Sequence, residues 1–229
     1  SYFYIKKQFN IIPRFRRIFV GRKIFRLFNL NFNIFIRTVL LTFAFLWVTY
    51  QSSKLGEDYL AVNTILMQFI LIASFFLDAY AFSTEGIVGF TVGRKAKKSF
   101  LQAVSNSIKL SFFTGIIISI IYLFLFKGIV NLITDLDYIR FLTYGFVFWI
   151  IIIPPVASFC YQLDGIFIGA TQSSEIRNSM ILSVFIFIFF SIYLTENMGN
   201  HGLWLALTFF MIVRSLTLNF YFTKILKKF

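Results

Sequence analysis

The chain has 229 residues, 59% of them apolar, and its mean hydropathy is +0.81. This apolar share exceeds that of ordinary soluble domains, so the composition excludes a typical water-soluble fold and favours an integral membrane protein. The net charge of +13 would suggest nucleic-acid binding in a soluble protein, but here the basic residues flank apolar segments and form no nucleic-acid-binding motif. We therefore expect membrane lipid, and not nucleic acid, to be the partner of these charges.

Residues 1–30 come first and contain eight basic residues and no acidic one. Their mixture of basic and aromatic side chains suits the headgroup region of an anionic leaflet, so we expect a basic cytoplasmic linker. The first residue is Ser, and no signal peptide is evident, which predicts that the chain starts part-way through a longer protein.

Six apolar segments follow, each long enough to cross a bilayer as a helix, for which roughly 20 residues suffice. The predicted spans are residues 33–52, 59–92, 101–126, 139–170, 178–195 and 202–223. The second and fourth exceed the bilayer thickness, which predicts helices that tilt or project beyond the lipid. The predicted fold class is therefore an all-α integral membrane bundle of six transmembrane helices, covering residues 31–229.

Loop charges predict the orientation of these spans. The termini and loops of one side contain 16 basic residues and one acidic residue, whereas the opposite loops contain three basic and five acidic residues. Because lysine and arginine are retained on the cytoplasmic side, both termini are predicted to be cytoplasmic.

Six ionisable residues remain inside the spans: Arg37, Asp78, Glu85, Lys109, Asp164 and Arg214. Their formal charges sum to zero, so mutual pairing would lower the cost of burying them in lipid. We expect the side chain of Lys109 to extend to the headgroups. The other five are candidates for ion or substrate coupling, because intramembrane charges usually mark a transport path.

Within the second span, Asn63 shares one helical face with Asp78 and Glu85 and becomes a sixth candidate. Such a polar face is expected to point to the bundle interior or to a water-filled cavity. Asp78 is the leading functional candidate. For Arg37, a structural ion pair with Asp78 or Glu85 and a role in transport fit the sequence equally well. For Arg214 we favour a structural role.

Pro154 and Pro155 lie in the middle of the fourth span. Proline lacks a backbone donor and clashes with the preceding turn, so a bend is expected. The bend is either passive or a hinge, since transporters often break helices near the bilayer centre. Gly165 and Gly169 follow with the four-residue spacing that lets two helices approach closely.

The sequence contains no arrangement of residues typical of catalysis. Cys160 and His201 are the single cysteine and histidine, too few for a disulfide or a Cys/His metal cluster. There is also no Ser/His/Asp set and no phosphate-binding glycine loop. We predict no enzymatic activity, no metal site and no cofactor apart from a coupling ion.

Two segments that contain an intramembrane aspartate resemble a known family. Residues 76–86 (FLDAYAFSTEG) are similar to the eighth helix of multidrug and toxin extrusion (MATE) transporters. Residues 163–172 (LDGIFIGATQ) resemble the tenth helix and following loop of their DinF-like branch, and residues 33–38 and 199–206 are also similar to that branch. Ala79 is a departure, because the family usually has glycine there.

The resemblance implies a twelve-helix transporter with two six-helix lobes, of which this chain is the C-terminal lobe. It implies secondary active efflux of drugs or organic cations by alternating access, coupled to inward H⁺ or Na⁺, in a bacterial inner (plasma) membrane. The implied partners are small organic substrates and an N-terminal lobe that the sequence lacks. In DinF-like members the coupling carboxylates are assigned mainly to that lobe, so Asp78 and Asp164 would then brace the cytoplasmic half.

Two other functions are kept as alternatives. A flippase for lipid-linked precursors, from the same superfamily, would need a strongly cationic cavity, and the zero formal charge inside the spans disfavours it. A non-transporting subunit of a membrane complex would need no more than the six helices.

Overall fold

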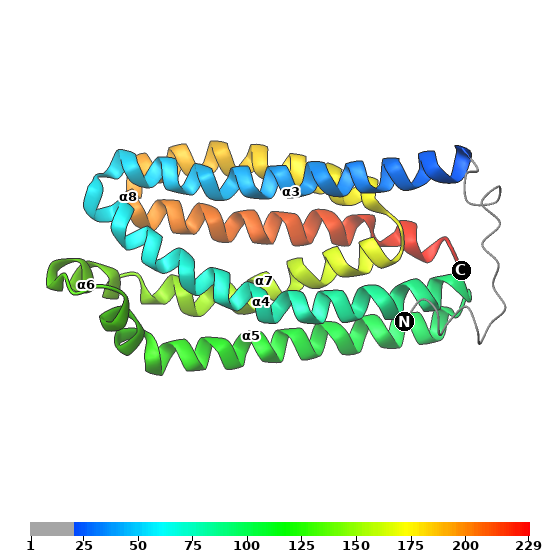
Figure 1. The fold of residues 1–229 in the computed structure, drawn as a ribbon, viewed down its shortest axis with the longest axis horizontal. Helices are drawn as coiled ribbons and strands as arrows, with labels where there is room; N and C mark the ends of the chain where they lie inside the picture. The colour runs from blue at the N-terminus through cyan, green and yellow to red at the C-terminus, as the bar shows by residue number, and fades with distance from the viewer. Residues whose placement is uncertain (1–20) are drawn as a thin grey trace, which may run out of the picture.

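The computed structural model describes residues 21–229, and the regular structure in this range is helical (Figure 1). Its helices are α3 (Gly21–Leu55), α4 (Glu57–Gly93), α5 (Lys97–Ile133), α6 (Asp137–Tyr144), α7 (Val147–Gly169) and α8 (Ser173–Leu226). All except α6 are long and apolar enough to cross a membrane, which confirms the predicted all-α membrane fold.

Helix α3 begins inside the segment that the sequence assigned to the linker. Residues 21–30 form its first turns, while residues 1–20, the remainder of the predicted linker, lie outside the described residues.

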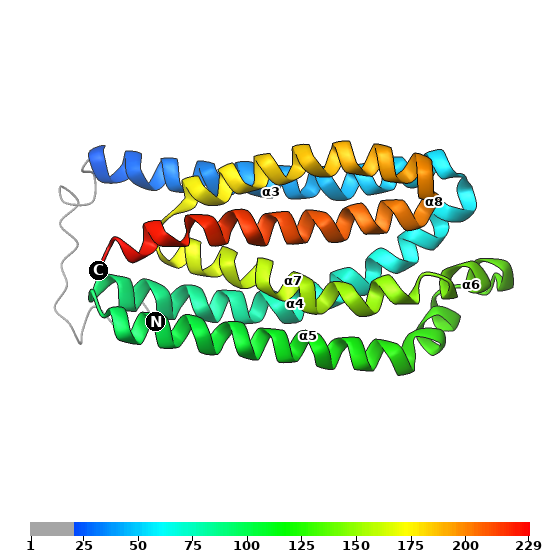
Figure 2. The ribbon, with the colours of Figure 1, turned by 180° about the vertical axis from the view of Figure 1, so that it is seen from behind.

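Helix α8 contains the predicted fifth and sixth spans. It reverses direction at Gly199, where φ is +56° and ψ is −139°. Glycine adopts such a conformation readily because it has no Cβ atom. The two arms of α8 therefore run side by side in opposite directions (Figures 1 and 2), and residues 21–229 make the six predicted crossings.

The prediction of one continuous helix over residues 139–170 is wrong. The chain breaks at Gly145 and Phe146, whose N–H groups bond to carbonyls only three residues earlier. The short helix α6 lies before this break, and Arg140 holds it against the end of α5 by donating to the carbonyl oxygens of Asn131 and Thr134. Hydropathy missed the break because apolar residues continue on both sides of it.

The long helices lie side by side along the long direction of the molecule, with α6 at one end and Gly21 and the C-terminus at the other (Figures 1 and 2). We call these the α6 end and the terminus end. One apolar cluster fills the half toward the α6 end, around Phe69, Ile150 and Trp204. A second, around Phe100 and Phe167, fills the terminus end. Large exposed side chains on the outer surface present the apolar area that a lipid environment requires.

Helices α4 and α7 approach most closely along the glycine-containing face of α7. A Cβ atom at Gly165 would overlap the backbone of Ala81, and one at Gly169 would overlap the backbone of Glu85. The expected close approach at these two glycines is therefore confirmed, and its partner is α4.

Candidate functional site

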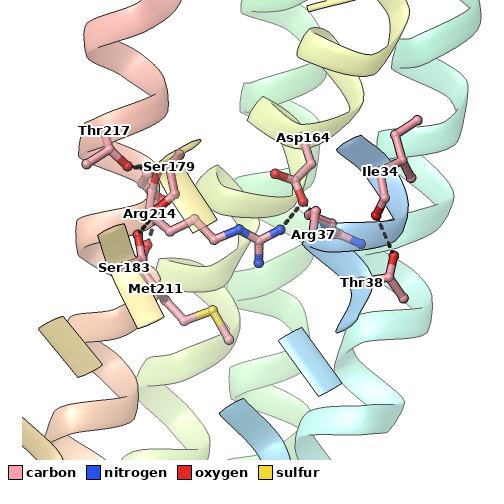
Figure 3. A network of polar contacts seen from close by, with 10 residues as sticks. Ile34, Arg37, Thr38, Asp164, Ser179, Ser183, Met211, Arg214 and Thr217 are labelled. Carbon is pink, nitrogen blue, oxygen red and sulfur yellow. Dashed lines mark hydrogen bonds and ion pairs between the residues drawn. The ribbon is translucent and has the colours of Figure 1, made fainter. Parts of the chain in front are cut away.

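Asp164 lies buried between the two apolar clusters, where α3, α7 and α8 meet. Its Oδ2 atom accepts a hydrogen bond from Arg37 on α3 and another from Arg214 on α8 (Figure 3). The side chains of Arg214 and Asp164 are 1% and 5% exposed, whereas that of Arg37 is 17% exposed. We call Arg37, Asp164 and Arg214 the Arg–Asp–Arg cluster. The predicted pairing of intramembrane charges is thus present, but Arg37 pairs with Asp164 and not with Asp78 or Glu85.

The pairing within the Arg–Asp–Arg cluster is incomplete. Two guanidinium groups share one carboxylate, so the cluster carries one excess positive charge when all three groups are ionised. Asp164 Oδ1 and the Nε atoms of both arginines are buried and have no hydrogen-bond partner among residues 21–229. Buried charges are stable only when paired, so a further acceptor close to the cluster would lower its free energy.

Asp78 on α4 is the acidic residue that can supply a negative charge to balance the excess positive charge of the cluster. It is half-buried and lies within electrostatic range of Arg37, Asp164 and Arg214. It forms no ion pair with any residue in the described range, so its carboxylate is free of a fixed partner. With Asp78 ionised, the four groups together are neutral.

Hydroxyl groups join the two arms of α8 next to the backbone of Arg214. Ser179 on the first arm shares a hydrogen bond with Thr217 on the second and also reaches the carbonyl oxygen of Arg214 (Figure 3). Ser183 lies one turn away and bonds to the carbonyl oxygen of Ser179. These contacts join the arms at the level where the guanidinium leaves α8 for Asp164.

Glu85 and Asn63, the other candidates on α4, lie apart from the cluster. Glu85 is half-buried, toward the terminus end. Asn63 is 15 residues before Asp78, which is about 22 Å along a helix. The residues that the sequence predicted as one polar stripe are therefore spread along the length of α4, and only Asp78 lies near the cluster.

Asn63 is the centre of a second buried polar network, at the α6 end. Its Nδ2 donates to Ser52 on α3 at 2.7 Å and to Asn200 at 2.6 Å. Its Oδ1 accepts from Asn200 at 3.0 Å and from Trp204 at 2.8 Å. The network ties α3, α4 and the α8 turn together. These partners were missed because they lie far away in the sequence; Asn200 next to Gly199 was the only local signal.

Pro154 and Pro155 are accommodated inside α7, whose axis changes direction along its length (Figures 1 and 2). Pro155 cannot donate to the carbonyl oxygen of Ile151, its usual helical acceptor. Ser119 on α5 donates to that oxygen instead, at 2.6 Å. One turn earlier, a Cβ atom at Gly115 would lie 2.9 Å from the carbonyl oxygen of Pro154. Helix α5 is therefore shaped to the proline segment through Ser119 and Gly115, which no sequence pattern singled out.

Basic side chains close the terminus end. Lys224 pairs with Glu175 at 3.1 Å, and Lys228 donates to the carbonyl oxygen of Ala170 at 2.5 Å. Burial and the nearby charge of Arg26 lower the pKa of Lys228, which lies beyond the last helix. These contacts fix the end of α8 against the α7–α8 connection.

Comparison with known sequences identifies relatives. Residues 34–195 match the protein family described as MatE. The DNA damage-inducible protein F of Escherichia coli is 36% identical over 193 residues, which are 84% of this chain and 42% of that protein. Protein DETOXIFICATION 43 of Arabidopsis thaliana is 26% identical over 216 residues, which are 93% of this chain and 40% of that protein.

Solved structures show the same fold. A MATE transporter of Vibrio cholerae, VcmN, superposes with a TM-score of 0.85 at 13% identity, over 97% of this chain and 51% of that chain. A MOP superfamily transporter of Pyrococcus furiosus, whose binding pocket is described as having reverse polarity, gives a TM-score of 0.78 at 17% identity, over 86% and 44%. The chain spans about half the length of these relatives.

Proposed function

Because this chain belongs to the MATE family of membrane transporters, we propose that it is the C-terminal lobe of a secondary active exporter. The family consists of transporters, so the chain is not an enzyme. The Arg–Asp–Arg cluster is the observation that carries the proposal, because charges buried at membrane depth are costly and usually belong to a transport mechanism. Drugs or organic cations leave the cell by alternating access, with H⁺ or Na⁺ entering in exchange.

Within this lobe, Asp78 is the coupling group and Asp164 is structural. Asp164 is held by two arginines, and protonating it would leave both guanidinium groups buried without a counter-charge. Asp78 is half-buried and has no fixed partner in the described range, so it can bind and release a proton or sodium ion. When Asp78 loses its charge, the excess positive charge of the cluster returns, which links ion binding to the packing of α3, α7 and α8.

The proline pair serves as the hinge in this proposal. The half of α7 beyond Pro155 carries Asp164 and packs through Gly165 and Gly169 against the backbone of α4. A change in the bend would therefore move Asp164, together with the part of α4 around Ala81 and Glu85, relative to Arg37 and Arg214. Such a movement couples the charge state of Asp78 to the opening of one side of the lobe.

The proposal is tested in a transporter that joins this chain to an amino-terminal six-helix lobe, by measuring dye efflux in inverted vesicles with an imposed H⁺ or Na⁺ gradient. Asp78→Asn is expected to reduce gradient-driven efflux at least tenfold while the protein remains folded. Asp135→Asn is the control, because Asp135 is fully exposed at the α6 end. Unchanged gradient-driven efflux in Asp78→Asn would remove this residue from the coupling mechanism.

A further inference from the structure

A cavity of about 660 Å³ opens at the α6 end, far from the Arg–Asp–Arg cluster. Parts of α4, α5, α6, the α6–α7 break and the α8 turn converge on it. Its volume is within the range of about 300–1,000 Å³ that is usual for small-molecule sites.

Aromatic rings form the walls of this cavity. The rings of Phe146 and His201 lie 4.5 Å apart between centroids, and Tyr59 meets Phe146 edge-on at 6.3 Å. Tyr144 lines the same space, with the ammonium group of Lys127 5.5 Å from its ring centroid. Phe146 is itself buried, so the half-buried rings of Tyr59 and Tyr144 are the walls open to a ligand. Such flat walls favour a planar aromatic ligand, which can stack on them or meet them edge-on.

The polar groups of the cavity include two hydrogen-bond donors. Trp149 donates its Nε1–H to Nδ1 of His201 at 3.1 Å. Since an indole nitrogen only donates, Nδ1 holds a lone pair, and the proton of the neutral imidazole is on Nε2. Neither this Nε2–H nor the ammonium group of Lys127 has a hydrogen-bond or carboxylate partner within residues 21–229.

Acidic residues occur at the same end, but none of them lines the cavity. Asp135 and Asp137 pair with Arg140, and their side chains are almost fully exposed. Glu57 and Glu196 face separate cavities, and Asp58 is exposed and does not line this one. Solvent and salt screen such exposed charges, whereas groups that line the cavity act at contact distance. The donors of Lys127 and His201 therefore decide which ligand charge is favoured.

We propose that this cavity binds a planar aromatic anion, with its ring against Tyr59 and Tyr144 and its carboxylate on Lys127 and His201. The cavity lies at the α6 end and does not include Asp78, so binding there requires neither ion coupling at Asp78 nor a particular direction of transport. Its occupant would touch α4, the α6–α7 break and the α8 turn at once, and would fix their relative positions.

The test is isothermal titration calorimetry of the full chain in lipid nanodiscs, with naphthalene-2-carboxylate and naphthalen-2-ylmethylammonium as probes. The probes share a ring and differ in charge, and the carboxylate is expected to bind at least about tenfold more tightly, as charge-assisted hydrogen bonds to two donors imply. Equal affinities, tighter binding of the ammonium probe, or no binding of either would overturn the proposal.

Variants then locate the binding. Lys127→Met is expected to weaken carboxylate binding at least about tenfold, and Lys127→Arg to retain it within about threefold. Lys54→Met is the matched control, because Lys54 lies at the same end over the ring of Tyr50 and does not line this cavity. An equal loss in Lys127→Met and Lys54→Met would show that the probe senses only surface charge, which would also overturn the proposal.

Discussion

At the scale of single residues, Asp164 links its own helix, α7, to α3 and α8 through one oxygen atom, Oδ2. Both guanidinium groups depend on the same acceptor, and Arg214 is the more deeply buried of the two donors. Breaking a buried pair costs more than the pair itself contributes, because an uncompensated charge remains in a medium of low polarity. The cluster therefore makes the fold sensitive to the loss of Asp164.

Asp164→Asn is expected to lower the free energy of unfolding by about 3–5 kcal/mol, because two guanidinium groups stay buried without a carboxylate. Denaturation in mixed detergent measures this change. In the Asp164→Asn background, Arg214→Met should cost less than it does alone, since it removes a charge that has lost its partner. Asp135→Asn serves as control and should change stability by less than about 1 kcal/mol. A comparable change in Asp164→Asn and Asp135→Asn would contradict the structural role of the cluster.

The network around Asn63 leads to a second prediction. Asn63→Ala leaves the donors of Asn200 and Trp204 buried without acceptors, and each orphaned donor costs about 1–3 kcal/mol. We expect a total loss of about 2–6 kcal/mol in the same denaturation measurement. Thr64→Val is the control, because Thr64 is exposed and its hydroxyl bonds only to the carbonyl oxygen of Leu60. A loss no larger than that of the control would show that the network contributes nothing.

At the scale of the helices, α7 is shaped to a different neighbour in each half. Near its middle, Ser119 and Gly115 of α5 fit the proline segment. Toward the terminus end, Gly165 and Gly169 fit the backbone of α4. A helix that is matched to two partners on either side of a proline bend is suited to move as two rigid halves.

The bond from Ser119 to Ile151 can be tested by a double-mutant cycle with Pro155. Ser119→Ala alone leaves the partly buried carbonyl oxygen of Ile151 without a partner and is expected to cost about 1–3 kcal/mol. In a Pro155→Ala background, the new backbone N–H can bond to Ile151, so the same substitution should cost about 1 kcal/mol less. Additive effects in thermal unfolding would show that the hydroxyl does not replace the missing helical hydrogen bond.

Two glycines of α4 and α7 give a matched pair of substitutions. Gly165→Ala would place a methyl group into the backbone of Ala81, so we expect a loss of more than about 2 kcal/mol or a failure to fold. A Cβ atom at Gly86 would meet open space, so Gly86→Ala is expected to be neutral or to stabilise α4 by up to about 1 kcal/mol. The melting temperatures of the two variants decide this, and equal destabilisation of both would contradict the close packing of α4 on α7.

At the scale of the whole molecule, the number and order of the crossings could be predicted from the sequence, because hydropathy over a bilayer length depends on composition alone. The partners of Asp164 could not. Arg37 and Arg214 lie 127 and 50 residues away, and their meeting depends on the rotation of each helix about its axis. Helical periodicity grouped Asn63 with Asp78 because it reports a shared face and ignores distance along the axis.

Orientation in the membrane is a property of the molecule as a whole. Exposed basic residues gather at the terminus end, where the α4–α5 connection and the first turn of α5 contain Arg94, Lys95, Lys97 and Lys98. At the α6 end, Asp135 and Asp137 are exposed around Arg140. Because positive charge is retained in the cytoplasm, the terminus end should be cytoplasmic and the α6 end should be on the opposite side.

Labelling of introduced cysteines in intact cells with a membrane-impermeant maleimide tests this orientation. Asp135→Cys is expected to be labelled at once, and Lys98→Cys only after the membrane is permeabilised. The reason is that Asp135 is exposed at the α6 end and Lys98 at the terminus end. The unsubstituted chain is a built-in control, since its one cysteine, Cys160, is buried and should react in neither condition. If Lys98→Cys reacts from outside and Asp135→Cys does not, the orientation is inverted. Asp78 would then lie nearer the outer surface, and a coupling ion entering the cell would reach it early rather than late.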